Sequence, residues 1–238
     1  MRHVVWDWNG TLFDDLDIVV ASVNESLESL GAGPIDTGRY AATYRRPLHL
    51  FYETLLGRTV APEEMATIDR VFHDAYQARL DGARLTVDAR VAVDMVARRG
   101  WTQSVLSMWW HDRLVPAVRH FGFEEYMLAV DGHRGVPGES KECHLAHHVE
   151  QLTRLFPAVS RDTVVVIGDV TDDADAALAA GVACVLYDGG SQPRADLEAS
   201  GAPVASSLVQ ALELVARRDV VAGAGSPGLR LPSGPALR

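Results

Sequence analysis

Val4-Val-Trp-Asp-Trp-Asn-Gly-Thr-Leu12 is the stretch of sequence that decides the fold. A short apolar run ends in Asp7, and Gly10 and Thr11 follow at once. A buried strand that carries a carboxylate at its C-terminal tip and then turns on a glycine is typical of an open α/β sheet. Asn9 stands two residues after Asp7, where a site built on a pair of aspartates would need its second carboxylate.

Short apolar runs alternate with helical patterns along most of the chain. We expect strands at residues 3–6, 103–107, 127–130, 163–167, 183–187 and 203–205. Helical periodicity covers 88–99, 111–121, 141–155, 173–180, 194–200 and 208–217. Strands separated by helices indicate βαβ units, so the sequence predicts an α/β fold with a Rossmann-like, doubly wound parallel sheet.

Residues 16–82 interrupt this alternation. Helical periodicity covers 16–30, 47–56 and 62–80, and turns rich in Gly and Pro separate these segments. We therefore expect a helical cap domain at 16–82, inserted after the first strand of a core formed by 1–15 and 83–218. Residues 219–238 are rich in Gly, Pro, Ala and Ser, which predicts a flexible C-terminal tail.

Composition limits the classes of partner. The net charge of −10 argues against a nucleic-acid backbone as a partner. No apolar run approaches the roughly 20 residues that span a bilayer, and no secretory pattern opens the chain, so we expect a cytoplasmic protein without a membrane partner. The 22 cations are 21 arginines and a single lysine, Lys141. An acidic chain that binds an anion must do so locally, with a metal ion, helix N-termini or a few cations.

Four polar elements follow the expected strands. They are Asp7-Trp-Asn-Gly-Thr11, Ser107, Lys141 after the loop 132–140, and Gly168-Asp-Val-Thr-Asp-Asp173. In this order they resemble the haloacid dehalogenase (HAD) superfamily, in particular its phosphoglycolate-phosphatase-like branch with a helical, C1-type cap. The resemblance runs from about Val4 to Tyr187.

This resemblance implies a phosphatase that acts on a small phosphorylated metabolite, such as a sugar phosphate, phosphoglycolate or a nucleoside monophosphate. Asp7 would be the nucleophile that forms an aspartyl-phosphate. Ser107 would donate a hydrogen bond to a phosphoryl oxygen, and Lys141 would neutralise the phosphate and the Asp7 carboxylate. The arginine-rich composition and the unusual motif would suit a specialised biosynthetic pathway.

The resemblance also implies a Mg²⁺ ion, because Mg²⁺ prefers oxygen ligands. Asp7, Asp169 and the backbone carbonyl of Asn9 would hold it. Asp173 would orient the waters on the metal. Asp172 would be either a neighbour of this site or a helix N-cap.

Several further residues are candidates for contact with the substrate. They are Gly10, Thr11, Tyr44, Arg45, Arg46, Met108, Trp109 and His111. For residues 44–47 the alternative is a solvated basic turn, and for 109–111 it is packing at the edge of the sheet. Cys143, His144, His147 and His148 could suggest a transition-metal site, and the alternative is a polar helix face.

Asn9 is the main departure from the family pattern. Phosphatases of the superfamily usually have Asp at this position, which protonates the leaving oxygen and then activates water. A neutral amide can do neither, and general acid–base catalysis is typically worth about 10²–10⁴-fold. The proton would then come from His111, from a cap residue or from the substrate itself. Engineering of Asn9 to trap a complex is a further alternative.

Three other readings follow from Asn9. Phosphonate hydrolases of the superfamily use a cap lysine, and residues 16–82 contain none. A 2-haloacid dehalogenase needs no acid but also no Mg²⁺, whereas Gly168-Asp169 keeps the metal pattern. A catalytically weak protein that binds a phosphometabolite remains the alternative outside enzymes. The sequence gives no indication of the oligomeric state.

Overall fold

The fold is built around one parallel sheet with the strand order β5-β4-β1-β6-β7-β8. The computed structural model describes residues 1–45, 47–135 and 140–217. The strands are β1 (His3–Trp6), β4 (Thr102–Trp110), β5 (Val130–His133), β6 (Val164–Gly168), β7 (Ala183–Tyr187) and β8 (Val204–Ala205). All neighbouring strands in this sheet are parallel, and the order confirms the predicted α/β, Rossmann-like class.

Helices cover both faces of the sheet. In β1, Val4 and Trp6 pack into one hydrophobic cluster and Val5 into the other, so the strand is apolar on both sides. The first face is covered by α5 (Ala89–Arg98), α6 (His111–His120) and α10 (Leu208–Ala216). The second face is covered by α7 (Lys141–Leu155) and α8 (Thr171–Ala180). The short helix α9 (Arg194–Ala199) lies before β8.

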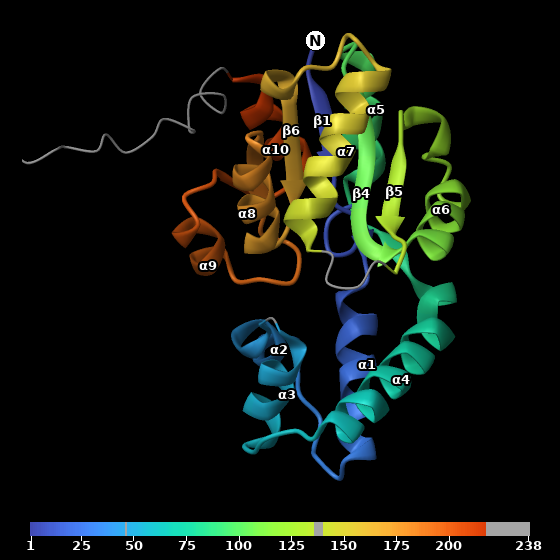
Figure 1. Cartoon of the computed structure of the whole chain (residues 1–238), viewed down its shortest axis with the longest axis vertical. Helices are drawn as coiled ribbons and strands as arrows, with labels where there is room; N and C mark the ends of the chain where they lie inside the picture. The colour runs from blue at the N-terminus through green and yellow to red at the C-terminus, as the bar shows by residue number, and fades with distance from the viewer. Residues whose placement is uncertain (46, 136–139, 218–238) are drawn as a thin grey trace, which may run out of the picture.

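The segment after β1 forms a separate helical body. Its helices are α1 (Leu16–Ser29), α2 (Thr37–Thr43), α3 (Leu48–Leu56) and α4 (Pro62–Arg79). They share a hydrophobic cluster of their own, which includes Val23, Leu27, Phe51 and Ile68. In Figure 1 the strand arrows point toward these helices, so the cap lies over the carboxyl ends of the sheet. In open α/β sheets this is the edge at which ligands bind.

A two-stranded ribbon joins the cap to the core. The short strands β2 (Phe13–Asp14) and β3 (Arg84–Leu85) pair antiparallel, with Phe13 opposite Leu85. They lie on the two chain segments that enter and leave the cap. The ribbon therefore fixes both connections side by side.

The structure adds or moves several elements relative to the sequence expectation. The strand expected at 103–107 runs from Thr102 to Trp110, so Ser107 lies within it and not at its end. Helix α2 was not expected; Asp36 caps it by accepting from the Arg39 amide at 2.7 Å. The strand expected at 127–130 begins at Val130 and continues to His133. This strand passes so close to α6 that position 132 requires a glycine, because a Cβ there would lie 2.7 Å from the His111 Cα. The ribbon β2–β3 was also missed, and the tail expected at 219–238 lies outside the described residues.

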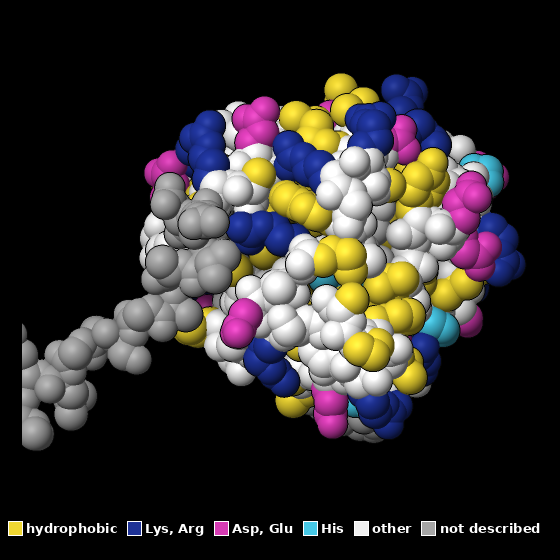
Figure 2. Space-filling model, turned by 90° about the horizontal axis from the view of Figure 1, so that it is seen from above, with side chains coloured by type: hydrophobic (Ala, Val, Ile, Leu, Met, Phe, Trp, Pro, Cys, Tyr) yellow, Lys and Arg dark blue, Asp and Glu magenta, His cyan; other side chains and the backbone are white. Residues whose placement is uncertain are grey.

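Surface charge is mixed on the end of the core that points away from the cap. Figure 2 views this end and shows basic, acidic and hydrophobic side chains interspersed over the part of the chain that is described. Among the described helices, none combines the length and apolar character needed to cross a bilayer.

Candidate active site

The nucleophile loop begins where β1 ends. The β1–β6 pairing continues into Asp7, whose amide donates to the Ile167 carbonyl at 2.9 Å. The Asp7 Oδ1 atom accepts from the Trp8 amide at 2.8 Å. The loop then closes on itself, because the amides of Thr11 and Phe13 both donate to the Trp8 carbonyl. Asp7 is thereby held at the tip of the strand with 6% of its surface exposed.

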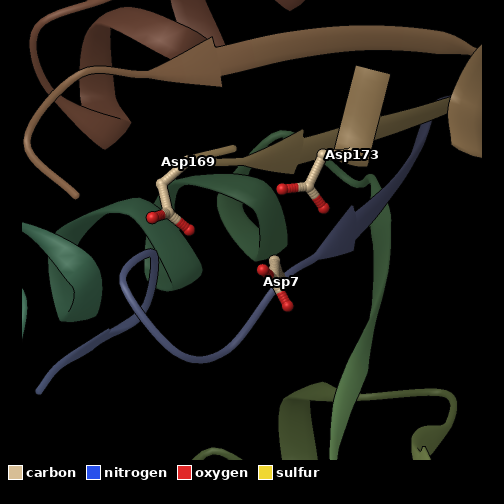
Figure 3. Close-up of side chains that lie close together, drawn as sticks. All are labelled: Asp7, Asp169 and Asp173. Carbon is tan, nitrogen blue, oxygen red and sulfur yellow. The ribbon is translucent and has the colours of Figure 1, made fainter. Parts of the chain in front are cut away.

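Three buried carboxylates meet at this edge of the sheet. Asp7 follows β1, Asp169 follows β6, and Asp173 lies in the first turn of α8. One oxygen from each lies within 4.8 Å of the others. Figure 3 shows the three side chains turned toward one shared space. A group of buried carboxylate oxygens at this spacing can hold a divalent cation.

Glycines make room for these carboxylates. A Cβ on Gly168 would lie 2.1 Å from the Asp173 Cγ, and a Cβ on Gly190 would lie 2.3 Å from the Asp169 Cβ. Gly10 adopts φ +75°, and a Cβ there would lie 2.3 Å from an Asp169 oxygen. Any side chain at these three positions would displace an acidic side chain of the cluster.

Lys141 supplies the positive charge of the cluster. It is the first residue of α7, whose N-cap Ser140 accepts from the Cys143 amide. Its Nζ lies 2.9 Å from Asp7 Oδ2 and 2.7 Å from Asp173 Oδ1. Burial lowers the pKa of Lys141, but Asp173 and Asp7 outweigh burial, so the net pKa is raised and the ammonium stays charged.

The cluster has three carboxyl groups and one ammonium. Burial raises the pKa of Asp7, Lys141 opposes this shift, and Asp173 and Asp169 add to it. Burial also raises the pKa of Asp169, and Asp173 raises it further. The raised pKa values show that one ammonium does not compensate three ionised carboxyl groups, and a divalent cation would stabilise their charged forms.

Hydrogen bonds orient the Asp169 carboxylate. Its Oδ1 accepts from Thr11 Oγ1 at 3.1 Å. Its Oδ2 accepts from the backbone amide of Ser191 at 2.8 Å and from the Ser191 hydroxyl at 2.7 Å. Sequence reasoning did not select Ser191; its position in the Gly189-Gly190-Ser191 turn after β7 was the available signal.

Asn9 is held at both ends of its side-chain amide. Its Nδ2 donates to Asp15 Oδ2 at 2.8 Å and to the Tyr76 hydroxyl at 3.0 Å. Its Oδ1 accepts from Ser107 Oγ at 3.2 Å. The Tyr76 hydroxyl also donates to Asp15 Oδ2 at 2.6 Å, and the Gly10 amide donates to Asp15 Oδ1 at 3.1 Å. Asp15 and Tyr76 are thus site residues that sequence reasoning missed.

A pocket of about 880 Å³ lies between this cluster and the cap. It brings together Asp7, Asn9, Ser107, Lys141 and Asp169 from the core. The cap side of its lining comes from α1 to α4 and includes several aromatic rings. The expected contact residues that line it are Gly10, Tyr44, Arg45, Met108 and Trp109.

Comparison with known proteins agrees with this geometry. The family model of the haloacid dehalogenase-like hydrolases matches residues 4–187. The chain belongs to the haloacid dehalogenase-like hydrolase family. The resemblance read from the four motifs is thereby confirmed. No curated protein matches the sequence.

Solved structures of HAD-like proteins share the fold. A predicted phosphatase from Clostridium acetobutylicum aligns with a TM-score of 0.76 and 18% identity, over 90% of this chain and 98% of its own. A predicted phosphoglycolate phosphatase from Haemophilus somnus aligns with a TM-score of 0.72 and 16% identity, over 90% and 97%. A HAD-like family protein from Streptococcus pneumoniae aligns with a TM-score of 0.76 and 14% identity, over 90% and 98%.

Within this HAD-like site, some expected residues take other positions. Helix α8 begins at Thr171 with Val170 as its N-cap, so Asp172 lies in the first turn and also lines the pocket. His111 opens α6, where its Nδ1 accepts from the Gly132 amide at 3.2 Å. Among the described residues His111 is not part of the pocket lining. Arg46 lies outside the described residues.

Two of the three histidines of α7 belong to the core instead. His144 and His148 are buried, and both lie within 3.8 Å of Asp131. The ring of His148 also contacts Ser104 Oγ at 2.8 Å. His147 is exposed and contacts Gln151. In the described part of the chain these histidines form no metal-ligand group.

Proposed function

We propose that this HAD-like protein is a Mg²⁺-dependent phosphatase that hydrolyses a small phosphomonoester through an aspartyl-phosphate on Asp7. The observation that carries the proposal is the charge arrangement at the strand tips. Asp7 lies beside an ammonium at 2.9 Å and shares a space within 4.8 Å with Asp169 and Asp173. Phosphoryl transfer requires a nucleophile, positive charge beside it and a binding site for a divalent cation, and this arrangement offers all three.

The residues of the chain divide the work of this reaction. The Asp7 carboxylate forms a bond to phosphorus while the bond from phosphorus to the ester oxygen breaks. Lys141 keeps the anionic phosphoryl group beside the anionic nucleophile, and Asp173 keeps the ammonium oriented. Ser107, which now donates to Asn9, would donate to a phosphoryl oxygen. Water then cleaves the aspartyl-phosphate and restores Asp7.

The donor set suits a hard divalent cation. Asp7, Asp169 and the backbone carbonyl of Asn9 would hold Mg²⁺, and Thr11 and Ser191 orient the Asp169 carboxylate. The bound ion would neutralise charge on the phosphoryl oxygens. All of these donors are oxygens, which favours Mg²⁺ over metals that prefer nitrogen or sulfur.

Phosphate release tests the proposal. Wild-type protein should release phosphate from a panel of small monoesters with Mg²⁺ and lose that activity in EDTA. Asp7→Asn should lower the rate by a factor on the order of 10³ or more. Asp175→Asn, at an exposed aspartate of α8, is the matched control and should behave as wild type. Metal-independent chloride release from 2-chloropropionate, without phosphate release, would contradict the proposal and indicate a dehalogenase.

A further inference from the structure

Aromatic rings run from the nucleophile loop into the cap. The backbone amide of Trp109 donates to Ser107 Oγ at 3.0 Å, which places this residue beside the site. Its ring lies 6.1 Å from that of Tyr76, which stacks at 5.8 Å on Phe72. Elsewhere in the lining the rings of Tyr40 and Tyr44 stack, with their centroids 5.1 Å apart. All five residues line the pocket, so the space above the nucleophile is bordered by rings.

Few cations border the described part of the pocket. The basic side chains of the described lining are Arg45, His73 and Lys141. Lys141 is paired with two aspartates, and His73 lies 3.3 Å from Asp69. Arg45 donates to the Leu50 carbonyl and to Thr54. Both partners of Arg45 are neutral, so Arg45 is the described lining residue that could still offer its charge to a second anionic group of the substrate.

The nucleophile loop does not offer a proton to the leaving oxygen. Asn9 has no acidic proton, and both ends of its amide are already hydrogen-bonded. Asp15 is occupied as an acceptor, because its two oxygens receive bonds from Asn9, Tyr76 and Gly10. A substrate whose leaving group needs no proton would fit this arrangement.

From the aromatic lining and the missing proton donor at position 9, and resting on the proposed phosphatase function, we infer that the substrate is an aryl phosphate, the phosphate monoester of a phenol. Its aromatic body would pack among Trp109, Tyr76 and Phe72. A phenol has a pKa of about 10, whereas an alcohol holds its proton about as tightly as water, with a pKa of about 16. Without protonation, phenoxide is therefore a much better leaving anion than an alkoxide.

The reaction balances without an acid at position 9. Asp7 forms a bond to phosphorus, the bond from phosphorus to the phenolic oxygen breaks, and its electron pair stays on phenoxide. Water then gives its hydroxyl to phosphorus and displaces Asp7. The remaining proton of that water ends on phenoxide, so aryl phosphate and water yield phenol and hydrogen phosphate.

Two isomeric esters test this inference. p-Tolyl phosphate and benzyl phosphate have the same composition and a similar apolar body, but only the first releases a phenol. We expect kcat/KM with Mg²⁺ to favour p-tolyl phosphate by about 10²-fold or more, because position 9 supplies no acid that would protonate the leaving oxygen of benzyl phosphate. A ratio below about tenfold would overturn the inference and leave the phosphatase function intact. No phosphate from any ester, phosphoglycolate included, would overturn both.

The role of the rings is tested separately. Phe72→Leu removes a ring at the far end of the row and keeps an apolar side chain, so folding should be preserved. KM for p-tolyl phosphate should rise about 3- to 10-fold with little change in kcat. Leu178→Ala, at a side chain with 72% exposure on α8, is the control and should leave KM unchanged. Equal KM values in Phe72→Leu and the control would overturn the assignment of the rings to the substrate.

Discussion

At the scale of single residues, the Asn9 amide and the Asp15 carboxylate act as a pair. Asp15 lies 2.8 Å from the Asn9 nitrogen and also receives the Gly10 amide. Burial raises the pKa of Asp15, and the bonds from Tyr76 and Asn9 counter that shift. An amide at position 9 therefore satisfies a buried carboxylate that a second carboxylate would repel. The hydrogen bond to Asp15 therefore explains why an amide stands at position 9, which the motif alone does not reveal.

This pairing changes the expected effect of restoring the usual aspartate. In Asn9→Asp the new carboxyl would face Asp15 and share a proton with it, so benzyl phosphate turnover should rise only slightly. The double variant Asn9→Asp with Asp15→Asn exchanges the two groups, so that position 9 carries the carboxyl and position 15 the amide. The kcat/KM for benzyl phosphate should then rise about 10²-fold, because the carboxyl at position 9 can act as the acid. The measurement is phosphate release with Mg²⁺. Asn9→Asp with Asp14→Asn, at an exposed aspartate, is the control; an equal gain in both double variants would contradict the pairing.

At the scale of secondary-structure elements, α4 is tied directly to the nucleophile loop. Tyr76 lies on α4, and its hydroxyl donates to Asp15 at 2.6 Å and accepts from Asn9 at 3.0 Å. The ribbon β2–β3 joins cap and core at the base of the same connection. One side chain thus couples the position of the cap to the geometry of the loop beside Asp7.

Tyr76→Phe should loosen this tie while keeping the ring in the pocket. A hydrogen bond to a charged group is worth about 1.5–3 kcal/mol, so the free energy of unfolding should fall by about that amount. Amide hydrogen exchange should accelerate together in α4 and in residues 8–15. Tyr52→Phe removes a hydroxyl from another buried cap residue and should affect the cap alone. Unchanged exchange in residues 8–15 of Tyr76→Phe would show that the hydroxyl does not couple the two parts.

The sequence predicted elements well where the local pattern decides the structure. The ends of α7 agree with the expected range because Ser140 caps it and Phe156 follows an unbroken periodic run. Contacts between distant segments were not predictable in this way. The hydrogen bond from Tyr76 to Asp15 joins residues 61 positions apart in the sequence. The strands β2 and β3 pair because the folded cap brings its two ends together. Asp15 was missed for the same reason, since its partners become neighbours only in the folded chain.

At the scale of the whole molecule, a buried polar chain crosses the core beneath the site. His3 on β1 contacts Thr102 Oγ1 at 2.8 Å and Ser104 Oγ at 2.9 Å, both on β4. Ser104 in turn contacts His148 on α7 at 2.8 Å, and His148 lies 3.4 Å from Asp131 on β5. The chain joins three strands and one helix, so its protonation affects the stability of the entire core.

Burial, with a smaller effect from His148, lowers the pKa of His3 to about 3. The unfolded chain would bind a proton there below about pH 6.5, whereas the native ring stays neutral. The stabilisation is therefore fully present above pH 6.5 and is lost as the pH falls, by up to about 1.4 kcal/mol per pH unit.

His3→Gln should lower the free energy of unfolding by about 1–3 kcal/mol at pH 7.5, because buried partners lose their bonds. In urea titrations between pH 7.5 and 4, its stability should then decline less steeply than that of wild type. His49→Gln, at an exposed ring, should keep the wild-type slope, and an unchanged slope in His3→Gln would mean that other groups govern the acid sensitivity of the core.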